Sequence, residues 1–142
     1  MDFVYSIHVS FYTEMVWPGF ISRMFVRNSK MDKKERIKMA IVDDGKRAVT
    51  HYEVLEEYNK GVTLVKCTLE TGRTHQIRVH ALSINHPLLG DEVYGPKNNK
   101  FKLKGQILHA KKLGFIHPTT KEYVEFEAPL PEYFKHLLEI LD

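Results

Sequence analysis

Cysteine is almost absent from the sequence: Cys67 is the only one among 142 residues, so the chain cannot form an internal disulfide. It lies in a run typical of a strand, where a buried thiol in the reducing cytoplasm is the expected state. No apolar run approaches the roughly 20 residues that a membrane-spanning helix needs. The first residues also lack the basic leader and small-residue cleavage site of a signal peptide. We therefore expect a cytoplasmic protein with no membrane segment.

Several motifs of catalytic and metal-binding proteins are missing as well. The eight glycines are scattered singly, which excludes a glycine-rich phosphate loop, and no serine has the glycine-elbow context of a hydrolase triad. The chain has eight histidines, but neither a His-x-x-x-His nor a Cys-x-x-Cys pair occurs. His75 and His80 are five residues apart, which places them on different faces of a helix. We therefore expect no metal site.

What is present is the composition of one globular domain. Hydrophobic residues make up 43% of the chain, enough to build a core, and charged residues 27%. The formal net charge of +3 permits an anionic partner but does not require one. Because the sequence shows no internal repeat and no linker, residues 1–142 are expected to form a single domain.

Extended segments dominate the pattern of apolar residues. Alternation predicts a strand in residues 1–11, and Asn59-Lys60-Gly61 between two β-rich runs predicts a hairpin. A helix is predicted from Thr74, as its N-cap, to Ile84, and a second helix begins at Pro131. The other predicted strands cover residues 20–26, 48–58, 62–69, 107–115 and 122–128. These elements predict an α+β fold with a mixed, mainly antiparallel sheet and a few helices.

Two stretches are rich in lysine. Residues 27–38 (RNSKMDKKERIK) have almost no apolar periodicity, and residues 97–104 form the second stretch. Such runs are usually solvated loops. The alternative is a mobile arm that follows RNA phosphates, in which Lys33, Lys34 and Arg36 would be contact residues. The pattern leaves both interpretations open.

The densest functional signal is the segment ETGRTHQIRVH, residues 70–80. A strand ends there, Gly72 permits a tight turn, and a helix begins with exposed amides that favour anions. Arg73 before the helix and Arg78 one turn into it add two permanently charged guanidinium groups. One could bind a phosphate and the other a protein carboxylate. Basic residues at helix starts are often simply exposed on the surface without a ligand, so this segment alone does not establish an anion site.

An ordered set of motifs carries a resemblance to a known family. After residues 70–80 come His86-Pro87-Leu88-Leu89-Gly90-Asp91, Val93-Tyr94-Gly95, Gln106-Ile107-Leu108-His109-Ala110 and Ala128-Pro129-Leu130-Pro131, with Arg36 and Gly45-Lys46 upstream. In this order and spacing, over about residues 19–131, the chain resembles RluA-type RNA pseudouridine synthases. A single motif would be weak, whereas the ordered set is highly specific.

The resemblance implies an isomerase that converts uridine in ribosomal or transfer RNA to its carbon-linked form without a cofactor or metal. An aspartate attacks the nucleoside after the base has left its stack, and an arginine, here Arg78, keeps that carboxylate ionised. Tyr5 matches the family's stacked tyrosine, although the usual lysine two residues earlier is Phe3, and Tyr5 could be an ordinary strand aromatic. The expected RNA-binding residues are Arg73, His75, Gln76, Lys33, Lys34 and Arg36.

The resemblance also reveals a missing part. The family's nucleophile lies in a His-Arg-Leu-Asp motif a few dozen residues before the stacked tyrosine, and this motif occurs nowhere in the 142 residues. The chain therefore looks like the C-terminal two-thirds of the catalytic domain and is expected to be inactive alone. A separately encoded N-terminal half could complete it. The alternatives are a truncated enzyme, a non-catalytic RNA-binding module and a degenerate fragment.

The missing segment should have structural consequences. It is expected to contribute strands, so its absence would expose sheet edges and apolar surface and favour self-association. A buried Arg78 without a partner would be costly. We therefore expect Arg78 to face solvent, a bound anion or a substitute acid such as Asp91 or Glu92. An internal carboxylate that holds Arg78 beside Tyr5 in an open cleft would contradict an incomplete active site.

Overall fold

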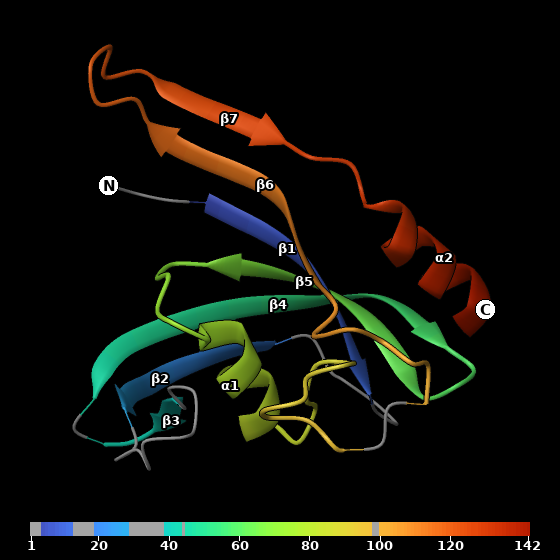
Figure 1. Ribbon diagram of the computed structural model, residues 1–142. Helices are drawn as coiled ribbons and strands as arrows, with labels where there is room; N and C mark the ends of the chain where they lie inside the picture. Colours follow the sequence, from blue (N-terminus) through green and yellow to red (C-terminus); the bar gives the residue numbers. More distant parts are fainter. Residues whose placement is uncertain (1–3, 13–18, 29–38, 44, 98–99) are drawn as a thin grey trace.

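A computed structural model of the chain describes residues 4–12, 19–28, 39–43, 45–97 and 100–142, the first two ranges through their backbone alone. Its strands form one sheet in the order β3-β2-β4-β5-β1-β6-β7 (Figure 1). Every neighbouring pair in this described sheet is antiparallel, which confirms the α+β prediction. The elements are β1 Val4–Tyr12, β2 Gly19–Asn28, β3 Met39–Ile41, β4 Lys46–Tyr58, β5 Val62–Leu69, α1 Gln76–Ser83, β6 Leu108–Ile116, β7 Tyr123–Glu127 and α2 Glu132–Leu141.

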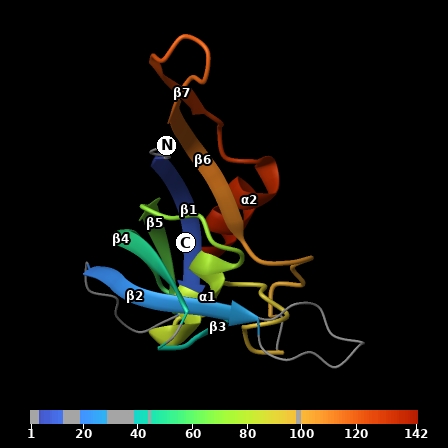
Figure 2. The same ribbon diagram turned by 90° about the vertical axis from the view of Figure 1, so that its left-hand side faces the viewer.

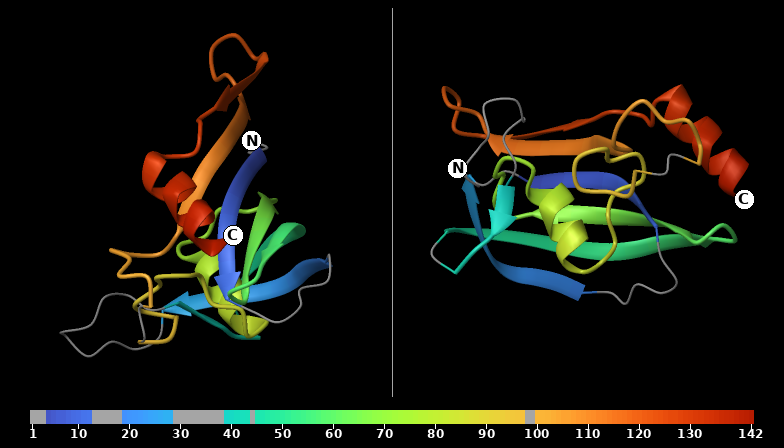
Figure 3. Two further views of the ribbon diagram at one scale, coloured as in Figure 1. Left: turned by 90° about the vertical axis from the view of Figure 1, so that its right-hand side faces the viewer. Right: turned by 60° about the horizontal axis from the view of Figure 1, so that its bottom comes forward.

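The central strand β5 organises the core. Its first four residues are all buried, so both faces of this end are covered, whereas burial alternates toward Leu69. Ile77 of α1 packs near the Leu69 end, and Phe134 of α2 packs against the Val62 end. Figure 3 shows the two helices toward opposite ends of the central strands, with the loop of residues 84–107 between them. This loop and α1 carry most of the residues of interest.

The hairpin between β4 and β5 forms where the sequence predicts it. Gly61 has a φ of 71°, a left-handed conformation that glycine adopts without strain, and its N–H donates to the Tyr58 carbonyl at 3.1 Å. β4 also contains a bulge, because its register against β5 shifts between Val54 and Glu56. The sequence pattern predicts the turn but not the bulge.

The structure contradicts the predicted start of α1 and confirms that of α2. Thr74 is predicted as the N-cap of α1, but the cap is His75, with a φ of 55° and no side-chain capping bond. The prediction is wrong because His75 would then be the first helical residue, and its left-handed backbone does not fit a right-handed helix. The Gln76 side chain reaches back to the loop and accepts the N–H of Arg73 at 3.0 Å. The start of α2 is confirmed: Pro131 precedes its first turn.

The last two strands form the predicted hairpin, whose far end projects beyond the rest of the molecule (Figures 1 and 2). In the sheet that the structure describes, β7 borders only β6 and is therefore an edge strand. On its surface Phe126 is 59% exposed and Tyr123 50% exposed. Phe126 stacks against Phe115 with ring centroids 6.0 Å apart. Exposed aromatic surface therefore lies beside this sheet edge, whereas the exposure and self-association expected from the missing segment stay predictions.

Cys67 is buried in β5, as predicted, and burial raises the pKa of its thiol to about 12. The thiol is therefore neutral at pH 7 and acts as a small apolar side chain. Neither helix in the described part of the chain has the length and apolarity needed to span a bilayer.

Candidate functional site

Arg78 projects from α1 and forms a two-point ion pair with Asp91. Its Nε donates to Oδ2 at 2.7 Å and its Nη2 donates to Oδ1 at 2.9 Å. The Arg78 side chain is 11% exposed and that of Asp91 is fully buried. The hydrogen bonds to Asp91 raise the pKa of Arg78 above its usual value. The expectation that Arg78 meets a substitute acid is confirmed for Asp91.

Asp91 also holds a tight turn in the loop after α1. Its Oδ1 accepts the N–H groups of Val93 and Tyr94, each at 3.0 Å, and its carbonyl accepts the N–H of Gly95 at 2.9 Å. Burial raises the pKa of Asp91, but the bonds from Arg78 and the two amides outweigh it and leave the pKa below its usual value. Both carboxylate oxygens are therefore engaged inside the protein.

Tyr94 connects this ion pair to the loop before α1. The guanidinium carbon of Arg78 lies 4.9 Å from the centroid of the Tyr94 ring, within the range of a cation–π interaction. The Tyr94 hydroxyl accepts the N–H of Met39 in β3 at 2.7 Å and lies 3.0 Å from Nδ1 of His75. Burial, with the nearby Arg78 charge, lowers the pKa of His75. Three segments distant in sequence thus meet at one phenol ring.

Gln76 holds the loop that begins α1. Its Oε1 accepts the hydroxyl of Thr71 at 2.8 Å and the N–H of Arg73 at 3.0 Å, while its Nε2 donates to the Val49 carbonyl at 3.0 Å. The Thr71 hydroxyl in turn accepts the N–H of Val49 at 2.9 Å. Gln76 is only 2% exposed. The loop is therefore fastened to β4 through a buried amide.

The same network continues to His80. Gln76 Nε2 also donates to Oγ1 of Thr50 at 3.0 Å, and Nδ1 of His80 lies 2.5 Å from that oxygen. Burial lowers the pKa of His80 to about 4, so the ring is neutral at pH 7. Its Nε2 has no hydrogen-bond partner within the part of the chain that the structure describes. His80 is therefore a buried, neutral side chain that joins α1 to β4 beneath the loop.

Arg73 lies on the outer rim of the loop. Its side chain is exposed, and its Nε donates to the Arg47 carbonyl at 3.4 Å. Nearby, Glu70 accepts hydrogen bonds from His51 and Arg47, both at 2.8 Å, and these hold the pKa of Glu70 below its usual value. The rim thus carries the exposed, positively charged guanidinium group of Arg73.

The other predicted site residues lie partly or wholly outside the described coordinates. Tyr5 sits in β1, where its backbone pairs with Leu69 and Leu113, and its side chain is outside the described part. Lys33, Lys34 and Arg36 are also outside the described residues. Their roles in catalysis and RNA binding stay predictions.

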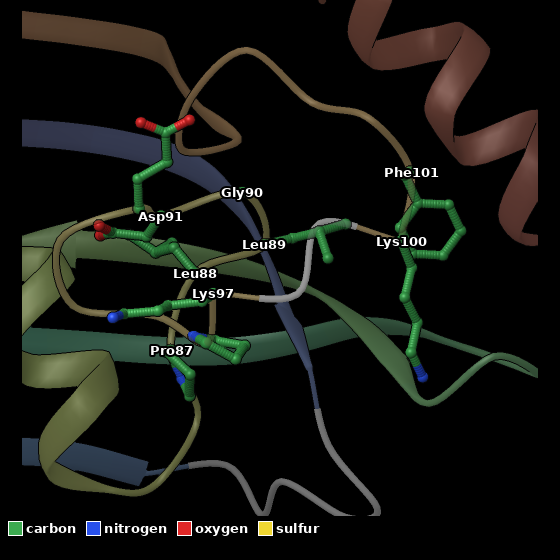
Figure 4. A pocket seen from close by; sticks show the side chains of 10 residues that line it. Pro87, Leu88, Leu89, Gly90, Asp91, Lys97, Lys100 and Phe101 are labelled. Carbon is green, nitrogen blue, oxygen red and sulfur yellow. The ribbon is translucent and has the colours of Figure 1, made fainter.

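A cavity of about 330 Å³ opens beside Asp91 in the loop after α1 (Figure 4). Leu88 and Leu89 give it an apolar part, and Lys97 and Lys100 add positive charge. Its remaining walls come from Pro87, Gly90, Asp91, Glu92, Pro96 and Phe101. Among the residues with described side chains, no group of three or more His, Cys, Asp or Glu is placed to hold a metal.

The structure therefore brings two predicted residues, Arg78 and His75, together at a third that the sequence reasoning left without a role, Tyr94. The only signal for Tyr94 was its place in the motif Val93-Tyr94-Gly95. Gln76 is engaged inside the protein, which favours a role in holding the loop, and its contact with RNA stays a prediction. Thr50 was also missed, because nothing in a strand pattern marks one threonine as a partner of His80.

Comparison with known proteins gives a consistent result. The family model of RNA pseudouridylate synthase matches residues 8–83, more than half of the chain. An uncharacterized RNA pseudouridine synthase YlyB of Bacillus subtilis is 58% identical over 110 residues, which is 78% of this chain and 36% of that protein. The ribosomal large subunit pseudouridine synthase D of Neisseria meningitidis serogroup A is 49% identical over 121 residues, 78% of this chain and 32% of that protein.

A solved structure shares the fold. The human RNA pseudouridylate synthase domain containing 1 superposes with a TM-score of 0.75 at 25% sequence identity, covering 99% of this chain and 66% of that chain. The chain spans about a third of the length of the curated relatives it matches.

Proposed function

The chain belongs to the RNA pseudouridylate synthase family, and from this premise we propose that it supplies the arginine side of a uridine-isomerising site. Arg78 is the residue proposed to hold the nucleophilic carboxylate. In this proposal residues 1–142 form one domain, the C-terminal two-thirds of a synthase catalytic domain, and work in the cytoplasm. Ribosomal RNA is the proposed substrate, because relatives bear that substrate in their names; transfer RNA is the alternative.

The observation that carries the proposal is the state of the acid beside Arg78. Asp91 is fully buried, and its two oxygens already accept four hydrogen bonds from Arg78, Val93 and Tyr94. A nucleophile must reach C1′ or the base of a nucleotide, so Asp91 is a structural partner and not the attacking group. The nucleophile must come from a polypeptide segment with the His-Arg-Leu-Asp motif, which the 142 residues lack.

The proposed isomerisation needs Arg78 for two reasons. A carboxylate taken out of water is pushed toward its neutral form, and a permanent positive charge opposes that shift. The guanidinium group also fixes the direction of the carboxylate, because its donors lie in one plane. Nη1 of Arg78 makes no hydrogen bond with any group in the described ranges, so it is the nitrogen proposed to receive the incoming acid.

Activity of two proteins tests this proposal. One is the 142-residue chain, and the other is a chimera in which the His-Arg-Leu-Asp region of an RluA-type relative precedes it. After incubation with ribosomal RNA, pseudouridine is measured by a pseudouridine-specific chemical readout. We expect no product from the chain alone and product from the chimera.

Arg78→Met in the chimera should lower the rate by about 100-fold or more, as losing a charged donor at a reacting centre does. Arg47→Met is the matched control, since Arg47 is an exposed arginine paired with Glu70. Turnover by the 142-residue chain alone, or an undiminished rate in the Arg78→Met chimera, would overturn the proposal. Salt-dependent RNA binding by a chimera without turnover would instead favour a non-catalytic RNA-binding module.

We also propose that the β6–β7 hairpin contacts another polypeptide. Phe126 and Tyr123, on opposite faces of β7, leave large aromatic surfaces exposed beside an edge strand. The partner is the segment that brings the nucleophile, or a second copy of the chain where that segment is absent.

A further inference from the structure

We propose that Tyr94 is a positioning residue that orients two donors at once: its ring fixes the Arg78 guanidinium group, and its hydroxyl fixes His75 so that Nε2–H is free to donate to an oxygen of the RNA. The RNA acceptor is a phosphate or base-carbonyl oxygen of a nucleotide. This inference rests on the proposed function for its ligand, and on contacts between described residues for its geometry.

The Tyr94 hydroxyl has two polar partners, of which one can only donate and the other can donate or accept. The backbone N–H of Met39 can only donate, so the Tyr94 oxygen is its acceptor at 2.7 Å. The hydroxyl proton of Tyr94 is then available for Nδ1 of His75, 3.0 Å away. A neutral histidine that accepts at Nδ1 carries its proton on Nε2. We infer this tautomer because a phenol that accepted from both Met39 and His75 would leave its own proton without an acceptor among the described residues.

His75 is neutral at pH 7 because its surroundings oppose a second proton. Burial lowers its pKa, and the Arg78 charge acts in the same direction, against a smaller opposing effect of Asp91. Its ring meets the Tyr94 ring edge-on, with centroids 5.6 Å apart. Nε2 has no hydrogen bond to the described part of the chain, and the residue is only partly buried. The nitrogen therefore keeps a proton that no described group accepts.

The backbone at His75 is a second, independent sign of constraint. Its φ of 55° is left-handed, a conformation that costs a residue with a side chain free energy relative to glycine. Such a conformation persists only where the surroundings hold it, and it is frequent at functional sites. Here Tyr94 bonds the ring of His75, and the Gln76 side chain fixes the backbone before it by accepting the N–H of Arg73.

The other end of Tyr94 is equally fixed. Its backbone N–H donates to Asp91, whose carboxylate binds Arg78, and its ring faces the same guanidinium group. Arg78 and His75 are therefore both oriented by one side chain in one turn. A change at the hydroxyl alone should disturb His75 and leave the Arg78–Asp91 pair in place.

The first test needs no RNA. Two-dimensional NMR of the 142-residue chain with ¹⁵N-labelled histidine at pH 7 reports the tautomer of each ring. We expect His75 to carry its proton on Nε2, with a hydrogen-bonded Nδ1. Tyr94→Phe should move the Nδ1 resonance to that of a nitrogen without a donor, whereas Tyr58→Phe, which removes a hydroxyl bonded only to Glu56, should not. A wild-type His75 protonated on Nδ1 overturns the inference.

The second test measures binding to a uridine-containing RNA hairpin. Tyr94→Phe should weaken binding about three- to tenfold, the usual effect of losing one oriented hydrogen bond. In a His75→Ala background the same substitution should have no further effect, because the two residues act through one contact. Additive losses overturn the inference. If the wild type does not bind the hairpin, the proposed function fails, while the NMR result still decides the role of Tyr94.

Discussion

At the scale of single residues, His80 is a base that the fold keeps neutral. Its ring is buried under α1 against Thr50, and its folded pKa is about 4. In the unfolded chain a histidine has a pKa near 6.5. Between these two values the unfolded chain binds a proton that the folded protein does not bind, so acid favours unfolding over this range.

We therefore predict that the free energy of unfolding falls as the pH is lowered from 6.5 to 4, by about 2–3 kcal/mol from His80. Urea unfolding at pH 7, 5.5 and 4.5 measures it. His80→Gln, which can still accept the Thr50 hydroxyl, should lose stability at pH 7 and show a flatter dependence on pH. His136→Gln, a change at an exposed histidine of α2, is the matched control. Equal pH slopes for His80→Gln and the wild type would contradict the prediction.

Some residue roles could be predicted from the sequence, and others could not. Asp91 was one of two acids expected near Arg78, and the ion pair confirms it. Tyr94 could not be assigned, because its partners Met39 and His75 lie in other segments and only the fold brings them together. Thr74 was a reasonable cap by residue type, yet the left-handed backbone of His75 delays the helix by one residue.

At the scale of elements, the described parts of the loop of residues 84–107 are cross-tied to one another. Ile107, at the end of the loop, donates its N–H to the carbonyl of Leu89 near its beginning at 2.8 Å. Gly90 lies at this junction with a φ of 76°, and a Cβ there would collide with the carbonyl oxygen of Gly105. Because that oxygen belongs to backbone, it cannot rotate away as a flexible side chain would.

Two glycine substitutions should therefore differ. Gly61→Ala places a methyl group in open space, so it should cost only the left-handed strain of about 1–2 kcal/mol. Gly90→Ala has the same strain and the collision with Gly105, so its loss of stability should be at least twice as large. Midpoints of urea unfolding measure both variants. Equal losses would show that the loop can move away from Gly105, against the cross-tied arrangement.

Local elements were the most predictable part of the fold. The β4–β5 hairpin and the start of α2 follow from Gly61 and Pro131, whose backbone preferences are intrinsic. The order of the strands could not be derived in this way. β1 pairs with both β5 and β6, and these contacts join residues far apart in sequence, which no periodicity encodes.

At the scale of the whole molecule, the β6–β7 hairpin combines an edge strand with exposed aromatic side chains. Within the described sheet its outer strand pairs on one side alone, and Phe126 on it is more than half exposed. Apolar surface of this kind beside an unpaired edge favours association between chains.

We predict that the 142-residue chain self-associates as its concentration rises. Light scattering coupled to size-exclusion chromatography, or sedimentation, gives the molecular mass. Phe126→Thr with Tyr123→Thr should shift the protein toward the monomer, while Tyr133→Thr, at an equally exposed aromatic of α2, should not. A wild type that stays monomeric at high concentration would contradict self-association through this hairpin.

The Arg78–Asp91 pair has a consequence for any acid that later joins the site. Two of the three guanidinium nitrogens already serve Asp91, so a newcomer shares a cation whose charge is largely balanced. It would bind end-on, through one oxygen, and would feel the negative charge of the resident carboxylate. The proton affinity of the attacking group would then depend as much on its neighbouring anion as on the arginine between them.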